Sequence, residues 1–195
     1  IVMEYKYNGY NLIAGCDEAG RGCLAGPVVA AAVVLPDNIE IEGINDSKKL
    51  TPLQRLKLRD VIINTALDYA IALVDNDVID EINILNASIL AMHKSIEQLK
   101  TKPDILLIDG NRFKQYKDIP HECVIKGDSK YAQIAAASIL AKTYRDELMT
   151  KLSAQYPHYE WNNNKGYPTQ KHVKAILSNG LTPLHRKTFS IPKLK

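Results

Sequence analysis

The chain has 195 residues, of which 46% are hydrophobic and 24% charged, and its formal net charge is +3. This is the composition of an ordinary soluble globular protein with one sizeable core. No apolar run approaches the ~20 residues that a membrane span needs, and no basic and then apolar leader opens the sequence. We therefore expect a cytoplasmic protein outside the membrane. The mild positive charge is compatible with nucleic-acid binding but does not indicate it alone.

The three cysteines, Cys16, Cys23 and Cys123, are an odd number without C-x-x-C spacing. That pattern argues against a disulfide framework or a zinc site, so we expect reduced, half-buried thiols. Residues 1–3 are an unusual native start, and no inference rests on them. No apolar stripe is left unaccounted for, which makes a monomer the expected state.

The stretch at residues 13–22 concentrates the chemistry. A short apolar run leads into Asp17-Glu18, and Gly20-Arg21-Gly22 follows. Adjacent carboxylates raise each other's pKa unless a cation lies between them, which suggests a divalent metal or a proton-sharing pair. The glycines leave the backbone around Arg21 open to a phosphodiester. The alternative is a polar turn in which Arg21 merely neutralises an acid, and these ten residues do not decide between the two.

The next segments predict two strands and a helix. Residues 28–35 are apolar without a break, as in a strand covered on both faces, and the short link predicts antiparallel pairing with the first strand. Thr51-Pro52 is typical of a helix start. Its expected buried residues are Leu53, Leu56, Val61 and Ile62. Ser47-Lys48-Lys49, just before this helix, is either a solvated loop or a phosphate contact.

Residues 69–74 predict a third strand, and a long amphipathic helix follows it as far as Pro103. Its apolar residues recur at steps of four and three: Val78, Ile82, Leu85, Ile89, Met92, Ile96 and Leu99. This stripe is expected to face the core. His93 beside it is expected at the helix boundary, because no second histidine stands one turn away.

Two further strands end in acids. Residues 105–108 lead to Asp109-Gly110, and residues 123–125 lead to Asp128. Long helical crossovers imply parallel strands, so Asp17, Glu18, Asp109 and Asp128 should converge at one edge of the sheet, where open α/β sheets bind ligands. A single strand-end acid is more often a cap or turn residue. Three such strands favour a functional site.

The last third contains a second long helix and a tail of different character. The helix is expected from Ser129 to about Tyr156, with early alanines that let it lie close to a sheet. Ser138, Lys142 and Arg145 share one face, either as a solvated stripe or as a grip on phosphate. The tail is aromatic and turn-rich, with a short helix at 170–177. We expect Trp161 to pack and Tyr167 to have a functional role.

Eight blocks of this sequence together resemble ribonuclease HII, the type 2 ribonuclease H family, between about Ile13 and Phe189. They are the stretches at 17–22, 26–30, 46–48, 107–110, 126–128, 136–142, 166–169 and 185–186. The resemblance implies an α/β ribonuclease H-like fold with a mixed five-stranded sheet flanked by helices, the second strand antiparallel. It implies one domain at 11–195, with its core at about 11–150 and a small C-terminal helical lobe at about 151–195.

The resemblance also implies an activity and the residues that perform it. The activity is cleavage of RNA in RNA–DNA hybrids and at ribonucleotides embedded in duplex DNA, leaving 5′-phosphate and 3′-hydroxyl ends. Asp17, Glu18, Asp109 and Asp128 resemble the catalytic, metal-binding carboxylates of the family. Gly20, Arg21, Gly22 and Tyr167 resemble its 2′-hydroxyl sensors, and Ser47, Lys48 and Lys142 resemble its phosphate contacts.

Carboxylates of this kind suit Mg²⁺ or Mn²⁺, and two ions about 4 Å apart would serve hydrolysis on both sides of the phosphorus. Cys23 departs from the proline common in the family, and no C-terminal extension for a sliding clamp is evident, so a clamp partner is not expected. Two other classes stay open: a magnesium-dependent phospho-acceptor or phosphatase domain, and a nucleic-acid-binding module without catalysis. The Asp17-Glu18 pair and Arg21 between glycines argue against the first.

Overall fold

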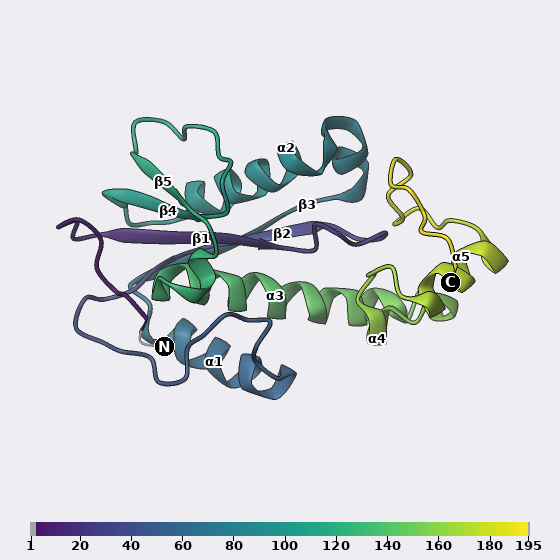
Figure 1. The fold of residues 1–195 in the computed structure, drawn as a ribbon, viewed down its shortest axis with the longest axis horizontal. Coiled ribbons are helices and arrows are strands. Elements are labelled where there is room, and N and C mark those ends of the chain that lie inside the picture. The colour runs from purple at the N-terminus through teal and green to yellow at the C-terminus, as the bar shows by residue number, and fades with distance from the viewer. Residues whose placement is uncertain (1–2, 195) are drawn as a thin grey trace.

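The structure is a computed structural model that describes residues 3–194 (Figure 1). Its centre is a five-stranded sheet in the order β3-β2-β1-β4-β5. The strands are β1 (Ile13–Ala19), β2 (Val28–Val34), β3 (Asp68–Val74), β4 (Ile105–Asp109) and β5 (His121–Val124). Strands β1, β4 and β5 are parallel, and β2 runs antiparallel to both of its neighbours. The predicted mixed sheet with an antiparallel second strand is confirmed.

Helices cover both faces of the sheet. Helix α2 (Asn76–Glu97) lies on one face, and α1 (Pro52–Thr65) and α3 (Ala132–Ser153) lie on the other (Figure 1). The apolar run of β2 is buried on both sides, because alternate residues pack into the core under α1 and α3 or into the core under α2. Burial of this run on both faces is confirmed.

Helix α3 lies against β1, as its early alanines predict. At Gly15 a Cβ atom would come within 2.1 Å of the backbone carbon of Gln133, so only glycine allows this approach. The helix begins at Ala132 rather than at Ser129, because the 3₁₀ turn η1 (Gly127–Ser129) precedes it.

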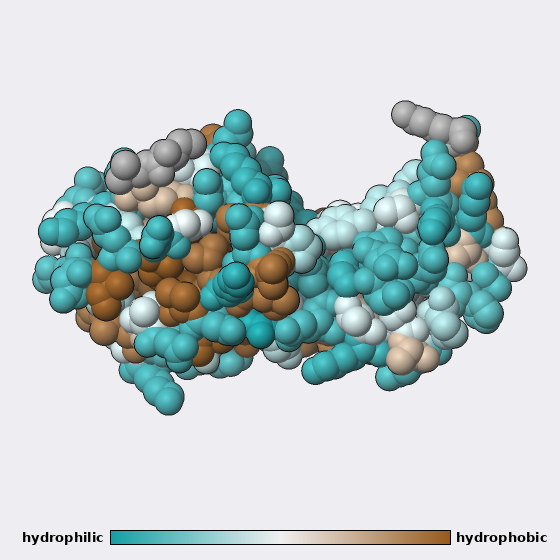
Figure 2. Space-filling model, turned by 90° about the horizontal axis from the view of Figure 1, so that it is seen from below, coloured by the Kyte–Doolittle hydropathy of each residue, from teal (hydrophilic) through white to brown (hydrophobic). Residues whose placement is uncertain are grey.

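Helix α1 corrects one sequence prediction. Its start is confirmed, with Thr51 and Gln54 forming a reciprocal capping box. Its buried residues, however, are Leu58 and Ile62, one turn apart. Leu53, Leu56 and Val61 remain on the surface, with exposed fractions of 63%, 38% and 42%. Figure 2, seen from the side of α1, shows apolar surface over this part of the molecule.

Helix α2 is shorter than predicted and is interrupted. Asn83 has φ +68°, a conformation outside the right-handed helix. Its side-chain Oδ1 accepts a hydrogen bond from the N–H of Asn86 at 3.1 Å, so Asn83 caps the second segment. The helix ends at Glu97, well before Pro103. His93 lies at its boundary, where its Nε2 is 2.9 Å from the carbonyl of Lys114.

A small helical lobe follows α3 (Figure 1). It contains η2 (Pro157–Tyr159), α4 (Trp161–Asn164) and α5 (Gln170–Asn179). Trp161 is fully buried at its centre, so the packing role predicted for it is confirmed. Helix α3 runs unbroken past residue 150 into the lobe, and the boundary placed there stays a prediction.

All three cysteines are free thiols; Cys16 and Cys23 are buried and Cys123 is half-buried. None of the helices within residues 3–194 combines the length and the apolar character needed to cross a bilayer.

Candidate active site

The four predicted acids come from the ends of three parallel neighbours. The pairing of β1 with β4 and of β4 with β5 brings the carboxyl ends of these strands to one edge of the sheet. Asp17 and Glu18 lie near the end of β1, Asp109 closes β4, and Asp128 lies in η1 just after β5. The structure therefore gathers residues from three distant segments at the edge where α/β sheets bind ligands.

Asp17 and Glu18 point to opposite faces of the sheet, because successive residues of a strand alternate. Asp17 is 6% exposed and lies beside the hydroxyl of Ser138 on α3. That hydroxyl is 2.9 Å from the Oγ of Ser47, which is buried in turn. On the other face, Glu18 accepts a hydrogen bond from Nη1 of Arg21 at 3.2 Å.

Asp109 and Asp128 are linked through the backbone of η1. The Oδ1 of Asp109 accepts hydrogen bonds from the N–H of Gly127 at 2.8 Å and of Asp128 at 3.4 Å. Asp128 is buried, and Nζ of Lys48 lies 3.4 Å from its Oδ2. Burial and the nearby charge of Asp109 raise the pKa of Asp128, while Lys48 acts in the opposite direction.

Burial and mutual repulsion dominate the electrostatics of the first pair. The pKa of Asp17 is raised well above its usual range, first by burial and then by the charges of Glu18 and Asp109. Burial also raises the pKa of Glu18, and the guanidinium of Arg21 offsets part of that rise. These carboxylates are close enough to repel one another, and a bound cation would relieve that repulsion.

Oxygen donors in this arrangement fit a hard divalent ion. Within residues 3–194, no three acidic, histidine or cysteine side chains form a ready-made coordination sphere. Mg²⁺ usually keeps several waters and takes only one or two protein carboxylates, with substrate phosphate completing its shell. Asp17, Glu18, Asp109 and Asp128 are the groups that would hold such ions.

The turn at Gly20–Gly22 lies directly beside Glu18. Gly20 has φ +94°, and a Cβ atom there would come within 2.0 Å of the Nε of Arg145, so glycine is required. A Cβ atom on Gly22 would meet nothing within 4 Å. Arg21 has half of its side chain exposed. The N–H groups of Arg21 and Gly22 form no backbone hydrogen bond within residues 3–194, which leaves them free to donate to a ligand.

Two buried arginines lie beside this turn, and one of them corrects a prediction from the sequence. Arg145 is 1% exposed and donates to the carbonyls of Ala25, Pro27 and Lys165 at 2.8–2.9 Å. Its hydrogen-bonding groups are used inside the protein, so Arg145 is not a phosphate contact. Arg186 donates to the carbonyls of Gly20, Arg21 and Gly26 at 2.7–3.0 Å: these bonds fix the backbone on which Glu18 and Arg21 stand.

The other predicted substrate contacts line the α3 side of the edge. Nζ of Lys142 lies 2.7 Å from the Oδ1 of Asp146 and 5.3 Å from the ring centre of Tyr167. Burial raises the pKa of Tyr167, whose ring is only partly accessible. The buried thiol of Cys23 lies 3.7 Å from the carbonyl of Lys165, two residues before Tyr167.

A family model described as Ribonuclease HII matches residues 14–191. The chain belongs to the ribonuclease HII family. The Ribonuclease HII of Phocaeicola vulgatus is 61% identical over 190 residues, which cover 97% of this chain and 94% of that protein. The Ribonuclease HII of Bacteroides thetaiotaomicron is 62% identical, covering 97% and 95%. This chain is therefore a ribonuclease H, a nuclease, and the phosphatase and purely binding alternatives are excluded.

Solved structures give the same fold. The ribonuclease H2 from Pyrococcus horikoshii OT3 has a TM-score of 0.76 and 30% identity, covering 92% of this chain and 94% of that one. Two more distant structures are a complex of PCNA with RNase HII from Archaeoglobus fulgidus and Bst-RNase HIII in complex with Mn²⁺. The Archaeoglobus structure has a TM-score of 0.75 at 23% identity and covers 94% of this chain and 98% of its own. The Bst-RNase HIII structure has a TM-score of 0.69 at 20% identity and covers 93% of this chain and 68% of its own.

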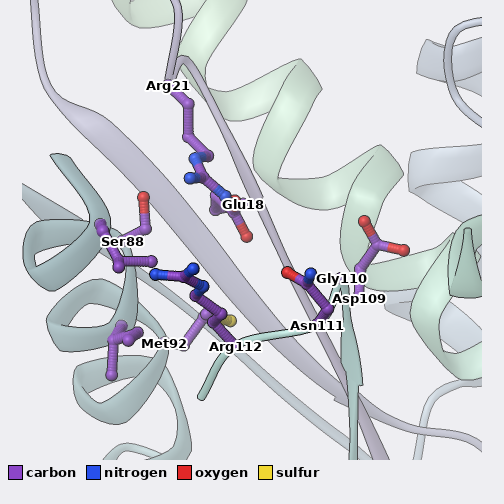
Figure 3. A pocket seen from close by; sticks show the side chains of 10 residues that line it. Glu18, Arg21, Ser88, Met92, Asp109, Gly110, Asn111 and Arg112 are labelled. Carbon is purple, nitrogen blue, oxygen red and sulfur yellow. Dashed lines mark hydrogen bonds and ion pairs between the residues drawn. The ribbon is translucent and has the colours of Figure 1, made fainter. Parts of the chain in front are cut away.

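In this ribonuclease HII chain, two residues that the sequence did not single out lie on the α2 side of the edge. Arg112 follows Asp109 by three residues, and Ser88 comes from the middle of α2; both line a cavity with Glu18 and Arg21 (Figure 3). An arginine so soon after a strand-end acid was the available signal for Arg112. Nothing in the sequence distinguished Ser88 from any other helical serine.

Proposed function

We propose that this chain hydrolyses the RNA strand of RNA–DNA hybrids and cuts at single ribonucleotides embedded in duplex DNA, leaving 5′-phosphate and 3′-hydroxyl ends. The observation that carries the proposal is the meeting of Asp17, Glu18, Asp109 and Asp128 at one edge, beside a turn with free backbone N–H groups. Membership of the ribonuclease HII family supports the same substrate class.

The proposed mechanism uses two divalent ions, Mg²⁺ or Mn²⁺. When bound by the four carboxylates, such ions would activate a water and stabilise the leaving 3′-oxygen. Arg21 favours the ionised form of Glu18 and offsets part of the rise in its pKa that burial causes, and the N–H groups of η1 orient Asp109 toward the edge. Lys48 likewise favours the ionised form of Asp128. Burial still leaves the pKa values of Asp17, Glu18 and Asp128 raised, and a bound cation would favour the ionised forms of these acids.

Recognition of the ribose is proposed for the turn and for Tyr167. The N–H groups of Arg21 and Gly22 are free, and a 2′-hydroxyl, which distinguishes RNA from DNA, can accept from such donors. The partly accessible Tyr167 ring lies beside Lys142, where a sugar face and a phosphate can be held together. The hydroxyl of Ser47 is hydrogen-bonded to that of Ser138. We therefore propose that Ser47 supports phosphate binding by its neighbour Lys48 and does not contact the phosphate itself.

A groove supports binding of a duplex. It lies between α1, α3 and the lobe and has a volume of about 940 Å³. Its lining includes Lys142, Lys151, Lys165 and Asn163 and also two acids, Asp146 and Glu147. Figure 2 shows the molecule hollowed between its two parts on this side. The partners that we propose are RNA–DNA hybrid and ribonucleotide-containing duplex, bound by a monomer. A clamp is not part of the proposal.

One incubation series tests this function. A DNA duplex with one ribonucleotide, a matched all-DNA duplex and a continuous hybrid are each incubated with Mg²⁺, Mn²⁺ or a chelator. We expect metal-dependent cleavage of the first and third, none of the second, and products whose 3′ ends can be extended by a polymerase. Cleavage in chelator, or products with 2′,3′-cyclic phosphate ends, would contradict the proposed mechanism.

A further inference from the structure

A cavity of about 190 Å³ lies on the α2 face of the catalytic edge. Its floor is apolar and comes from α2, and its polar wall comes from the segments after β1 and β4. Figure 3 shows that the guanidinium of Arg112 lies against α2 beside Ser88, while Arg21 reaches in with Glu18 from the opposite side. None of the roles proposed above uses Ser88, Asn111 or Arg112.

Ser88 has a hydroxyl without a partner. Its residue is 1% exposed, and its Oγ forms no hydrogen bond with any group of residues 3–194. A helical serine often satisfies its hydroxyl on a carbonyl of the preceding turn, and a buried hydroxyl left unpaired is destabilising. Ser88 lines the cavity, and its hydroxyl is a donor that no group of residues 3–194 uses.

Arg112 is a cation without a counterion. Its side chain forms no ion pair with the acids of residues 3–194, although two carboxylates line the same cavity. Glu18 is paired with Arg21, and Asp109 is hydrogen-bonded to the backbone of η1. Figure 3 shows the Asp109 carboxylate on the side of its strand away from Arg112. The charge of Arg112 is left to attract an anion.

We propose that this cavity binds a phosphate group of a nucleic-acid strand. Arg112 and Arg21 supply the positive charge, and the hydroxyl of Ser88 and the amide of Asn111 supply further donors. The cavity borders Glu18 and Asp109, so the phosphate belongs to a nucleotide close to the one that is cut. This inference rests on the proposed function, because it adds a contact for the same substrate.

Binding measured in chelator tests the proposal without cleavage. Each phosphate contact contributes about 0.7–0.9 to the slope of log K against log salt. We expect Arg112→Gln to lower that slope by this amount and to weaken hybrid binding about tenfold at 0.1 M salt. Ser88→Ala should weaken binding about threefold with the slope unchanged, because the hydroxyl carries no charge. Arg112→Lys should keep the slope.

The control is Lys94→Gln. Lys94 is an exposed cation on the same helix, outside the cavity, and its loss removes one positive charge without touching the site. We expect the slope to stay at the wild-type value. An equal fall in slope for Lys94→Gln and Arg112→Gln would mean that Arg112 acts only through net charge, and the proposal would fall.

Two sources of the phosphate are separated by a second arm. If the cavity holds an internal phosphodiester, Arg112→Gln weakens binding of the intact hybrid, and 5′-phosphorylation of a cleaved product has no effect. If it holds the new 5′-phosphate, the phosphorylated product binds wild type more tightly than its 5′-hydroxyl form, and Arg112→Gln removes that difference. Either result supports a phosphate site.

Absence of both effects overturns the cavity proposal alone, provided that wild type still cuts hybrid. If wild type neither binds nor cuts hybrid, the proposed function fails first and this inference falls with it.

Discussion

Nη2 of Arg186 donates to the carbonyl of Gly20 at 2.7 Å, which joins the segment after α5 to the turn beside Asp17 and Glu18. The same guanidinium also reaches the carbonyls of Arg21 and Gly26. Arg186 is 2% exposed, and burial lowers its pKa to about 10, so it is still charged at neutral pH. A buried, charged side chain that donates to three backbone carbonyls thus sets the path of the turn.

Arg186→Met should destabilise the protein by about 3–5 kcal/mol, because it leaves three backbone carbonyls without their donor. Urea unfolding followed by circular dichroism measures this. Lys187→Met is the control: Lys187 is an exposed neighbour, and its replacement should change the free energy of unfolding by less than about 0.5 kcal/mol. A loss of less than about 1 kcal/mol in the free energy of unfolding for Arg186→Met would show that the turn keeps its conformation without Arg186.

The two glycines of the turn should respond differently to alanine. Gly20→Ala requires a positive φ and puts a methyl group into the side chain of Arg145, so we expect a loss of about 2 kcal/mol or more in stability. Gly22→Ala has open space and should leave stability within about 0.5 kcal/mol of wild type. Because Gly22 is proposed to approach the ribose, the second variant should nevertheless lose preference for ribonucleotide-containing duplex. Thermal unfolding and competition binding separate the two effects.

The sequence was sufficient to predict that the four acids share one edge of the sheet, because the relevant signal is local. An apolar run that ends in an acid, repeated three times with helical crossovers between, allows few topologies besides parallel strands that share one edge. The same is true of β2, whose uninterrupted apolar residues require cover on both faces. These features depend on residue type and spacing and on no contact between distant segments.

Arg145 and Asn83 show what spacing could not supply. Arg145 shares a helical face with Lys142, yet its neighbours at Ala25 and Lys165 come from loops distant in sequence, and they bury it. Arg145 becomes an internal hydrogen-bond donor only because the fold places those carbonyls around it. Asn83 lies within a regular apolar stripe, and nothing in that spacing indicates the positive φ that interrupts α2.

Asp109→Asn should abolish cleavage while the protein stays folded. The amide keeps an oxygen that can accept from Gly127, and removal of one charge lessens the repulsion that raises the pKa of Asp17. In chelator the variant should therefore be as stable as wild type or slightly more so. Hybrid binding should be retained, and product formation should fall at least a hundredfold.

Metal addition gives this variant a second readout. A ligand that binds only the folded protein raises its stability by RT ln(1 + [L]/Kd). Millimolar Mn²⁺ should raise the melting temperature of wild type and raise that of Asp109→Asn much less. Near-wild-type cleavage by Asp109→Asn would remove this residue from the mechanism.

The histidine pair of the lobe makes stability depend on pH. His172 and His185 are fully buried, with their Nε2 atoms 3.1 Å apart. Nδ1 of His185 accepts from the N–H of Thr182, so its proton lies on Nε2, and Nε2 of His172 accepts from the indole N–H of Trp161. Burial lowers the pKa of His185 to about 4 and also lowers that of His172. Both rings are neutral in this network.

The sign of the effect follows from that lowered pKa. In the unfolded chain a histidine takes up a proton near pH 6.5, whereas His185 in the folded protein does so only near pH 4. Between these values the unfolded state binds more protons, so stability is complete above about pH 6.5 and is lost as the pH falls toward 4. The loss should be of the order of 1–3 kcal/mol. Urea unfolding at pH 7.5, 6 and 5 measures it.

His185→Asn, which keeps an acceptor for Thr182, should be less stable at pH 7.5 but should show a shallower fall in stability as the pH is lowered. His158→Gln, at an exposed histidine, should follow the wild-type curve. An unchanged fall in His185→Asn would assign the pH dependence to other groups.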